Sequence, residues 1–334
     1  MAVTARDVAE AVGVSAATVS LVVNGKSAGR VTAETEERVW AAVRELDYRV
    51  HAGASRLASG RPGTVVFVSP DPTNPFFSLL LDGLLAGLDD RFALSVVAPR
   101  GDDYDTATVR RAQAGDVAAL VLVAPGDDII RSLSSARPTV LIDAGARIPG
   151  MSGMNVDVRE AGRLLADHLT GLGHRTLAYV GLDRPRQTFR RRRAALEQRL
   201  AEQGASFPVP DTIVGRMSMD AAQTAASSAL DDWLAAGVSA IVCADDLLAF
   251  GVLRALGERG IEVPGRLSVA AFNDTAYAAI VTPSLTSVDL RARELGRGTA
   301  VLLRELLDGA SPSWAEVAPR LVARESTGPP SGAN

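Results

Sequence analysis

The sequence of 334 residues has little that would serve covalent or metal chemistry. Its single cysteine, Cys243, excludes an internal disulfide and fits a reducing compartment. The three histidines, His51, His168 and His174, lack the spacing of metal ligands. There is no glycine-rich nucleotide loop, no G-x-S-x-G motif and no Ser/His/Asp constellation. We therefore expect no enzyme, no metal and no cofactor.

Long apolar runs and an excess of positive charge are also missing. No apolar stretch approaches about 18 residues and no secretory core follows Met1, so we expect a cytoplasmic protein without membrane insertion or export. The net charge is −4, and Lys26 is the only lysine. Residues 1–61 hold eight Arg or Lys and seven Asp or Glu, a balance of +1, which leaves −5 for the remainder. Any nucleic-acid binding must then depend on charge arranged locally.

Residues 4–48 have the pattern of three short helices. Thr4 and Ser15 are expected to cap the first two helices, and Gly13 to end the first. Thr32 is expected to cap a third helix, which has glutamates in its first turns. The first two helices around a tight turn form a helix-turn-helix, whose second helix fits the major groove of DNA.

The segment V-A-x-x-x-G-V-S-x-x-T-V-S-x-V-x-N, starting at Val8, resembles the headpiece of the LacI/GalR family of bacterial transcription regulators. Similar landmarks continue downstream with DPTNPFF at 71–77, GLGHRTLAYVG at 171–181, CADDLLAFGVLRAL at 243–256 and LSVAAFND from 267. The resemblance covers roughly residues 3–326. It implies a sequence-specific DNA-binding regulator, most often a repressor, that binds palindromic operator DNA as a homodimer and responds to a small-molecule effector.

From residue 64 onward short apolar strands alternate with amphipathic helices, which predicts an α/β fold of doubly wound parallel sheets. Strands are expected at 64–69, 93–98, 118–124, 139–144, 175–181, 212–215, 238–243 and 267–272. Helices are expected at 76–90, 105–115, 127–135, 157–171, 190–203, 219–236 and 245–259. The resemblance implies a two-lobed periplasmic-binding-protein-like core.

The expected domains are a helix-turn-helix headpiece (1–48), a hinge segment (49–61) and a core for effector binding and dimerisation (62–330). Lobe one of that core would comprise about 62–155 and 286–317. Lobe two would comprise about 156–285 and 318–328.

The DNA-contacting residues follow from the resemblance and from general rules of groove recognition. Side chains at the start of the second helix read base edges, whereas hydroxyls and amides hold phosphates. The base-reading positions are then Ala16, Ala17 and Leu21, which offer only apolar contacts, although Leu21 could instead pack in the headpiece. The expected backbone contacts are Ser15, Thr18, Ser20, Asn24 and Thr35. Leu57 stands where the family wedges a hinge leucine into the minor groove; the alternative is a linker residue without that role.

The effector is expected at the carboxyl ends of the strands, where open α/β sheets bind ligands. Aromatic rings with carboxylates and amides suit a sugar or related polyol. The resemblance adds an arginine in the helix after 171–181, with Arg190 as the best match, Arg186 as the alternative, and the other arginines of 190–193 on the surface. The expected effector residues are Asn74, Phe76, Phe77, Asp143, Arg190, Met217, Asp245 and Asn273.

Two questions stay open from the sequence. Asp245 and Asp246 could also cap the following helix. Met217 and Asn273 stand where sugar-binding relatives have an aromatic residue and an aspartate, which argues against a simple hexose. The alternative function is a small-molecule sensor with the same core fold but without transcriptional repression, and binding to a palindromic duplex would separate the two.

Overall fold

The computed structural model describes residues 5–23, 27, 29–46, 63–90, 92–99, 105–114, 117–133 and 137–331. The predictions for Thr4, Asn24 and Leu57 lie outside these residues. The chain divides into two units, one containing the headpiece and one containing most of the α/β core, and each is described by itself. Among the described residues, no helix has the length and the apolar content that a bilayer crossing requires.

The headpiece consists of three helices, α1 (Ala5–Val12), α2 (Ala16–Val23) and α3 (Ala33–Glu45). Gly13, with a φ of 74°, makes the left-handed turn between α1 and α2. The Ser15 hydroxyl accepts a hydrogen bond from the Thr18 amide at 3.1 Å, and the Thr32 hydroxyl accepts one from the Thr35 amide at 3.3 Å. Both predicted caps are therefore confirmed. The three helices close over a small apolar core formed by Val8, Ala9, Val12, Val19, Val22, Val39 and Ala42.

The first lobe contains a six-stranded sheet with the order β11-β5-β4-β3-β1-β2. Its strands are β1 (Thr64–Val68), β2 (Ala93–Val97), β3 (Val117–Val123), β4 (Thr139–Ile142), β5 (Ser152–Val156) and β11 (Trp314–Val317). Its helices are α5 (Pro75–Gly87), α6 (Thr106–Ala112), α7 (Asp127–Ser132) and α12 (Ala292–Leu307). Strands β3, β4, β5 and β11 run parallel. Helices α5 and α12 can pack closely because Gly83 has no side chain. A Cβ at that position would overlap the carbonyl of Arg293.

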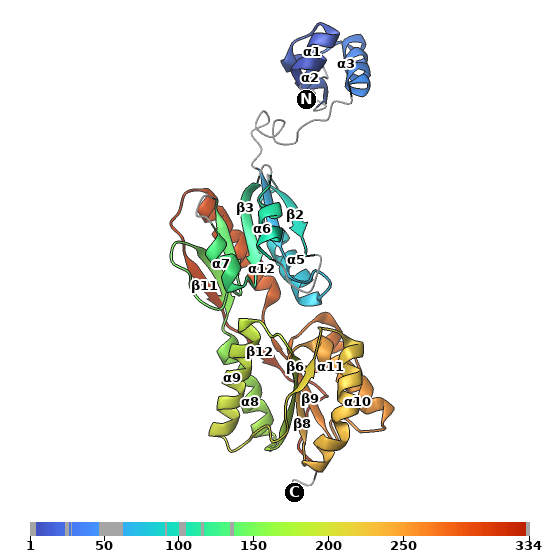
Figure 1. Cartoon of the computed structure of the whole chain (residues 1–334), viewed down its shortest axis with the longest axis vertical. Helices are drawn as coiled ribbons and strands as arrows, with labels where there is room; N and C mark the ends of the chain where they lie inside the picture. Colours follow the sequence, from blue (N-terminus) through green and yellow to red (C-terminus); the bar gives the residue numbers. More distant parts are fainter. Residues whose placement is uncertain are drawn as a thin grey trace. The chain divides into compact units, whose positions relative to one another are not determined.

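The second lobe contains a six-stranded sheet with the order β12-β10-β9-β8-β6-β7. Its strands are β6 (Leu177–Leu182), β7 (Thr212–Val214), β8 (Ala240–Cys243), β9 (Ser268–Asn273), β10 (Thr286–Asp289) and β12 (Arg320–Val322). All neighbours run parallel except β12, which is antiparallel to β10. Helices α8 (Val158–Gly171) and α9 (Gln187–Glu202) cover one face, and α10 (Met219–Ala235) and α11 (Asp246–Glu258) cover the other (Figure 1). The predicted α/β fold with two parallel-sheet lobes is confirmed.

The chain passes between the lobes three times, and one predicted crossing is misplaced. The sequence prediction assigns 286–289 to the first lobe, but β10 pairs in register with β9 in the second sheet. The crossing follows at Leu290 and Arg291, where Arg291 has a left-handed φ of 59° that ends the strand and starts α12. The return crossing lies between β11 and β12, where Arg320 pairs with Asp289 in the antiparallel register.

Candidate DNA-binding surface and effector site

The face of α2 that could meet DNA is small and apolar. Ala16 and Ala17 are exposed, whereas Val19 and Val22 are buried beneath them. Leu21 is half-buried and is not among the described side chains that pack against the headpiece core. The described headpiece core therefore does not include Leu21, and its contact with a base stays a prediction. Because burial of the valines fixes the rotation of α2, the positions predicted to read bases share its outer surface.

The hydroxyl groups predicted to contact phosphate are held in local hydrogen bonds. Ser15 and Thr18 share a hydrogen bond of 2.9 Å between their hydroxyl oxygens, and Thr32 and Thr35 share one of 2.8 Å. Thr18, Ser20 and Thr35 are half-buried and Ser15 is exposed. The helix caps therefore place these hydroxyls near the amino ends of α2 and α3, where phosphate binding is favoured by the helix dipole.

Three of the predicted effector residues form one buried hydrogen-bonded group, which we call the inner cluster (Asn74, Asp245 and Asn273). The side-chain amides of Asn74 and Asn273 both donate to Oδ2 of Asp245, at 3.2 Å and 2.7 Å. None of the three residues is more than 5% exposed. Since Asn74 precedes α5 of the first lobe, whereas Asp245 follows β8 and Asn273 ends β9 of the second lobe, the inner cluster joins the lobes.

Two members of the inner cluster also cap helices. Oδ1 of Asn74 accepts from the Phe76 amide at 2.9 Å, and Oδ1 of Asp245 accepts from the Leu247 amide at 2.9 Å. The capping role considered for Asp245 is therefore confirmed. Burial raises the pKa of Asp245, while the hydrogen bonds from Leu247, Asn74 and Asn273 and the charge of Arg192 oppose the rise. The Asp245 carboxylate and the Asn74 side chain are consequently satisfied by partners within the protein.

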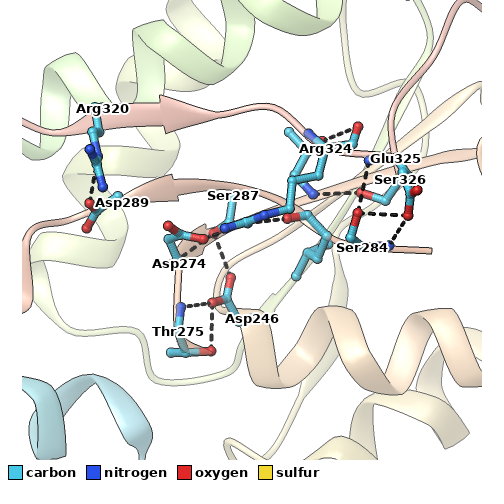
Figure 2. A network of polar contacts seen from close by, with 12 residues as sticks. Asp246, Asp274, Thr275, Ser284, Ser287, Asp289, Arg320, Arg324, Glu325 and Ser326 are labelled. Carbon is cyan, nitrogen blue, oxygen red and sulfur yellow. Dashed lines mark hydrogen bonds and ion pairs between the residues drawn. The ribbon is translucent and has the colours of Figure 1, made fainter. Parts of the chain in front are cut away.

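Asp246 lies next to the inner cluster but belongs to a different network (Figure 2). Its carboxylate accepts from the Thr275 amide at 2.7 Å, the Thr275 hydroxyl at 3.0 Å and the Ser287 hydroxyl at 2.7 Å. Burial, reinforced by the charge of Asp245, raises the pKa of Asp246 to about 7. The network fixes the turn after β9, where Asn273 and Asp274 have positive φ values, and Arg324 pairs with Asp274 at 2.6 Å. Asp246 thus helps to fix the turn that directly follows Asn273.

Two other predicted effector residues, Asp143 and Arg190, line a separate cavity of about 210 Å³, which we call the outer cavity. It is lined by Ala124, Pro125, Gly126, Asp127, Asp143, Ala144, Arg184, Pro185, Arg186, Gln187, Thr188 and Arg190. The first six belong to the first lobe and the last six precede or begin α9. Arg186 links the lobes by donating to the Ala124 carbonyl at 3.0 Å.

Asp143 gives the outer cavity an acceptor with unused capacity. It follows β4 with a left-handed φ of 55°. Its Oδ1 atom is buried and has no hydrogen-bond partner among the residues that the structure describes. Burial raises the pKa of Asp143 to about 6, although the hydrogen bond from Thr188 and the charges of Arg192, Arg186 and Arg191 oppose the rise. A ligand hydroxyl could satisfy this atom.

Arg192 was missed by the sequence prediction, which places the arginines around Arg190 on the surface. Arg192 is only 3% exposed and donates through Nη2 to the Ala244 carbonyl. Its guanidinium carbon lies 4.1 Å from the centre of the Phe272 ring and 4.8 Å from that of Phe189. Burial lowers the pKa of Arg192, and the charges of Tyr179, Asp245, Asp143 and Asp246 oppose that.

The signal for Arg192 was present in the sequence. The buried residues of α9 are Thr188, Arg192, Leu196 and Leu200, which repeat every four positions. An arginine on this apolar stripe must face the sheet, where it lies among the carboxylates that follow the strands. Arg193 also departs from the surface prediction, because its guanidinium lies over the rings of Tyr179 and Phe207 at 4.5 Å and 4.0 Å.

The structure separates the predicted effector residues into distinct groups. Among the residues described, Asp143 and Arg190 line the outer cavity, whereas the inner cluster, Phe76, Phe77 and Met217 do not. Phe76 is buried and meets Phe77 edge to face, with ring centres 5.4 Å apart, and Met217 is half-buried. Arg190 is exposed and donates to the Pro185 carbonyl at 2.5 Å.

Comparison with known proteins agrees with both parts of the chain. The model of bacterial regulatory proteins of the lacI family matches residues 4–50, and that of the periplasmic binding protein-like domain matches residues 166–327. An HTH-type transcriptional regulator of Streptomyces limosus is 31% identical over 96% of this chain and 93% of its own. The maltose regulon regulatory protein MalI of Escherichia coli is 29% identical over 88% and 89%.

Solved structures give the same result. The lac repressor dimer bound to operator and an anti-inducer is 25% identical, with a TM-score of 0.73 over 98% of this chain and 100% of that chain. The transcriptional regulator CelR in complex with cellobiose is also 25% identical, with a TM-score of 0.67 over 97% and 99%. The likeness thus extends over headpiece and core together.

Proposed function

Because this chain belongs to the lacI family of bacterial regulatory proteins, we infer that it is an operator-binding transcriptional repressor controlled by a small molecule in the cleft between its lobes. The observation that carries this function is the helix-turn-helix, with α2 presenting Ala16, Ala17 and Leu21 outward on a closed three-helix core. We assign it binding and not catalysis, and we place its action in the bacterial cytoplasm, on chromosomal DNA.

The residues proposed to contact bases are all apolar. Ala16, Ala17 and Leu21 would contact base edges through methyl groups, for which the thymine methyl is the natural partner. Ser15, Thr18, Ser20, Asn24 and Thr35 would hold the phosphates, and Leu57 would act within the hinge 49–61. We retain 1–48 as the headpiece and 62–330 as the core.

The homodimer is proposed to close over an apolar surface of the second lobe. Tyr277 is 52% exposed and Ile280 is 73% exposed, although both are large and apolar. Phe250 on α11 meets Tyr277 edge to face, with ring centres 6.5 Å apart. A contiguous apolar surface of this kind favours a protein contact, and a two-fold dimer would present two headpieces to a palindrome.

The effector is proposed to act by changing how the lobes meet. Asn74 and Arg186 both bond across the cleft, so a ligand that competes with or adds to these contacts changes the balance between two lobe arrangements. Thermodynamic linkage then requires that operator DNA change the affinity for the effector by the same factor. CelR in complex with cellobiose and MalI of the maltose regulon support a sugar-related effector.

Selection from a random duplex library followed by fluorescence anisotropy tests this function. We expect a palindromic consensus that the full chain binds at least about a thousandfold more tightly than a scrambled duplex. Leu21→Arg should change the preferred half-site, whereas Trp40→Arg, at an exposed position on α3, should leave it unchanged. If no palindrome is enriched over scrambled DNA, the repressor function is wrong and a sensor without repression takes its place.

A further inference from the structure

The start of α9 has an unusual electrostatic design. Its N-cap residue is Arg186, which makes no side-chain capping hydrogen bond, and its first turn has no acidic residue. Every other described α-helix begins with a capping side chain, an acidic residue in its first turn, or both. Arginines near a helix amino terminus are unfavourable because that end carries positive charge. Asp143 offsets part of this charge, since Arg186, Arg191 and Arg192 act electrostatically on its carboxylate, and a bound anion would offset more of it.

The outer cavity is where that positive charge is concentrated. Arg184, Arg186 and Arg190 line it, and Arg191 and Arg192 act electrostatically on the carboxylate of Asp143 at its wall. Only two carboxylates, Asp127 and Asp143, are among the lining residues. The lining residues thus include three arginines and two carboxylates, a local excess of one positive charge in a chain whose net charge is −4.

The geometry leaves donors available for a ligand. Arg190 is exposed, and its bond to the Pro185 carbonyl occupies one of five N–H donors. Its guanidinium is suited to bidentate recognition of a phosphate or carboxylate, and the first amides of α9 add main-chain donors. On the opposite side, the unpartnered Oδ1 of Asp143 accepts hydrogen bonds and so selects a neighbouring hydroxyl group.

We propose that the outer cavity binds a hydroxylated organic anion, namely a sugar phosphate or a sugar acid. Its anionic group lies against Arg186, Arg190 and the amino end of α9, and a sugar hydroxyl donates to Asp143. The volume of about 210 Å³ is below the range of roughly 300–1,000 Å³ for drug-sized ligands, which favours a compact monosaccharide derivative. This inference rests on the proposed function and names the chemical class of its effector.

The first test uses inorganic anions and requires no knowledge of the natural effector. Thermal unfolding of the DNA-free full chain is measured in phosphate, sulfate and chloride at equal ionic strength. Phosphate and sulfate should raise the unfolding temperature of the wild type relative to chloride by more than they raise that of Arg186→Gln/Arg190→Gln, which keeps only the general stabilisation by these anions. Arg163→Gln is the matched control, since Arg163 is exposed on α8 and does not line the outer cavity. Equal stabilisation of wild type and double variant, or none by either anion, overturns the proposal.

The second test compares pairs of sugars by calorimetry: glucose with glucose 6-phosphate, and glucose with gluconate. The anionic member of at least one pair should bind more tightly, which also separates phosphate from carboxylate. Arg190→Gln should weaken that binding about tenfold or more. Neutral glucose binding as tightly as both anions would overturn the proposal.

Fluorescence anisotropy of operator DNA with the same protein preparations distinguishes failure of the anionic-effector proposal from failure of the proposed repressor function. A neutral sugar that releases the operator while the anions do not would refute the anionic effector and leave the repressor function standing. Failure to bind any palindrome would refute the repressor, whereas the anion measurements on DNA-free protein would still decide the ligand class.

Discussion

The inner cluster and the outer cavity differ in how far the hydrogen-bonding capacity of their polar groups is used. In the inner cluster, two amides converge on one oxygen of Asp245, while the other oxygen of Asp245 and the side-chain oxygen of Asn74 cap helices, so these groups are satisfied within the protein. In the outer cavity, Asp143 has a buried oxygen without a partner and Arg190 bonds only to a main-chain carbonyl in the described structure. Polar groups that satisfy each other hold lobes together, and polar groups left with capacity select a ligand.

The largest effect should come from Arg192, which lies between the two regions. Arg192→Met removes the buried cation near Asp143, Asp245 and Asp246 and should lower the free energy of unfolding by about 3 kcal/mol. Urea unfolding measures this. The matched control, Arg190→Met on the exposed side of the same helix, should change stability by no more than about 0.5 kcal/mol. Equal midpoints for the two variants would show that the buried charge has no structural role.

The contrast between the regions is tested directly by their two aspartates. Asp245→Ala removes a helix cap and the acceptor of two buried amides, and should cost about 2–3 kcal/mol. Asp143→Asn should cost less than about 0.5 kcal/mol, since an asparagine tolerates the left-handed backbone and little is lost. Asp143→Asn should nevertheless weaken effector binding. A reversal of the two stability losses would invalidate the division into satisfied and unsatisfied groups.

The pH dependence of Asp246 should sharpen the comparison further. Its pKa rises from an ordinary 3.8 to about 7 in the folded protein, so the folded state holds a proton that the unfolded state releases. The stabilisation from that proton is complete below about pH 4 and is lost as the pH rises through about 7. Urea midpoints at pH 5 and pH 8 should therefore differ more for the wild type than for Asp246→Asn. Parallel pH profiles for the two proteins would contradict this assignment.

The smallest expected effect concerns the bond across the lobes. Asn74→Ser keeps an oxygen that can cap α5 but removes the amide that donates to Asp245. We expect a loss of about 1 kcal/mol in stability, the contribution of an ordinary hydrogen bond. We also expect a change in effector affinity without any change in the preferred operator. Thr108→Ser, a polar substitution elsewhere in lobe one, should leave effector affinity unchanged.

The sequence predicts the structural features that depend on residues close to one another in the chain. The caps at Ser15 and Thr32, the helix-turn-helix and most strands follow from local spacing, and the structure has all of them. The prediction stops at 272 and therefore omits α12, although Leu295, Leu302 and Leu303 provide the helical spacing of an apolar face. It also begins α9 at 190, three residues after its actual start at Gln187, and so does not identify Arg186 as the residue at the N-cap position of that helix.

The candidate site is less predictable because its contacts join distant residues. Asn74 and Asp245 are 171 positions apart in the sequence, so their hydrogen bond cannot be inferred from spacing. The same holds for Arg192, whose stacking on Phe272 depends on the packing of α9 against the second sheet. The carboxyl ends of the predicted strands lie within two residues of those in the structure, but the contacts between polar groups at these ends depend on the tertiary fold.

The pairing of β10 with β12 has a mechanical consequence. Both strands lead to crossings between the lobes, and Asp289 and Arg320 tie them at one point, with 2.9 Å between carboxylate and guanidinium (Figure 2). We expect a joint held at this point to resist sliding of the lobes and to permit their rotation. In such a rotation, displacement increases with distance from the ion pair. The crossing strands then move little, and the distal ends of the lobes move most. Removing the ion pair, as in Arg320→Ala, should weaken the effect of effector binding on the arrangement of the lobes and leave the effector affinity itself unchanged.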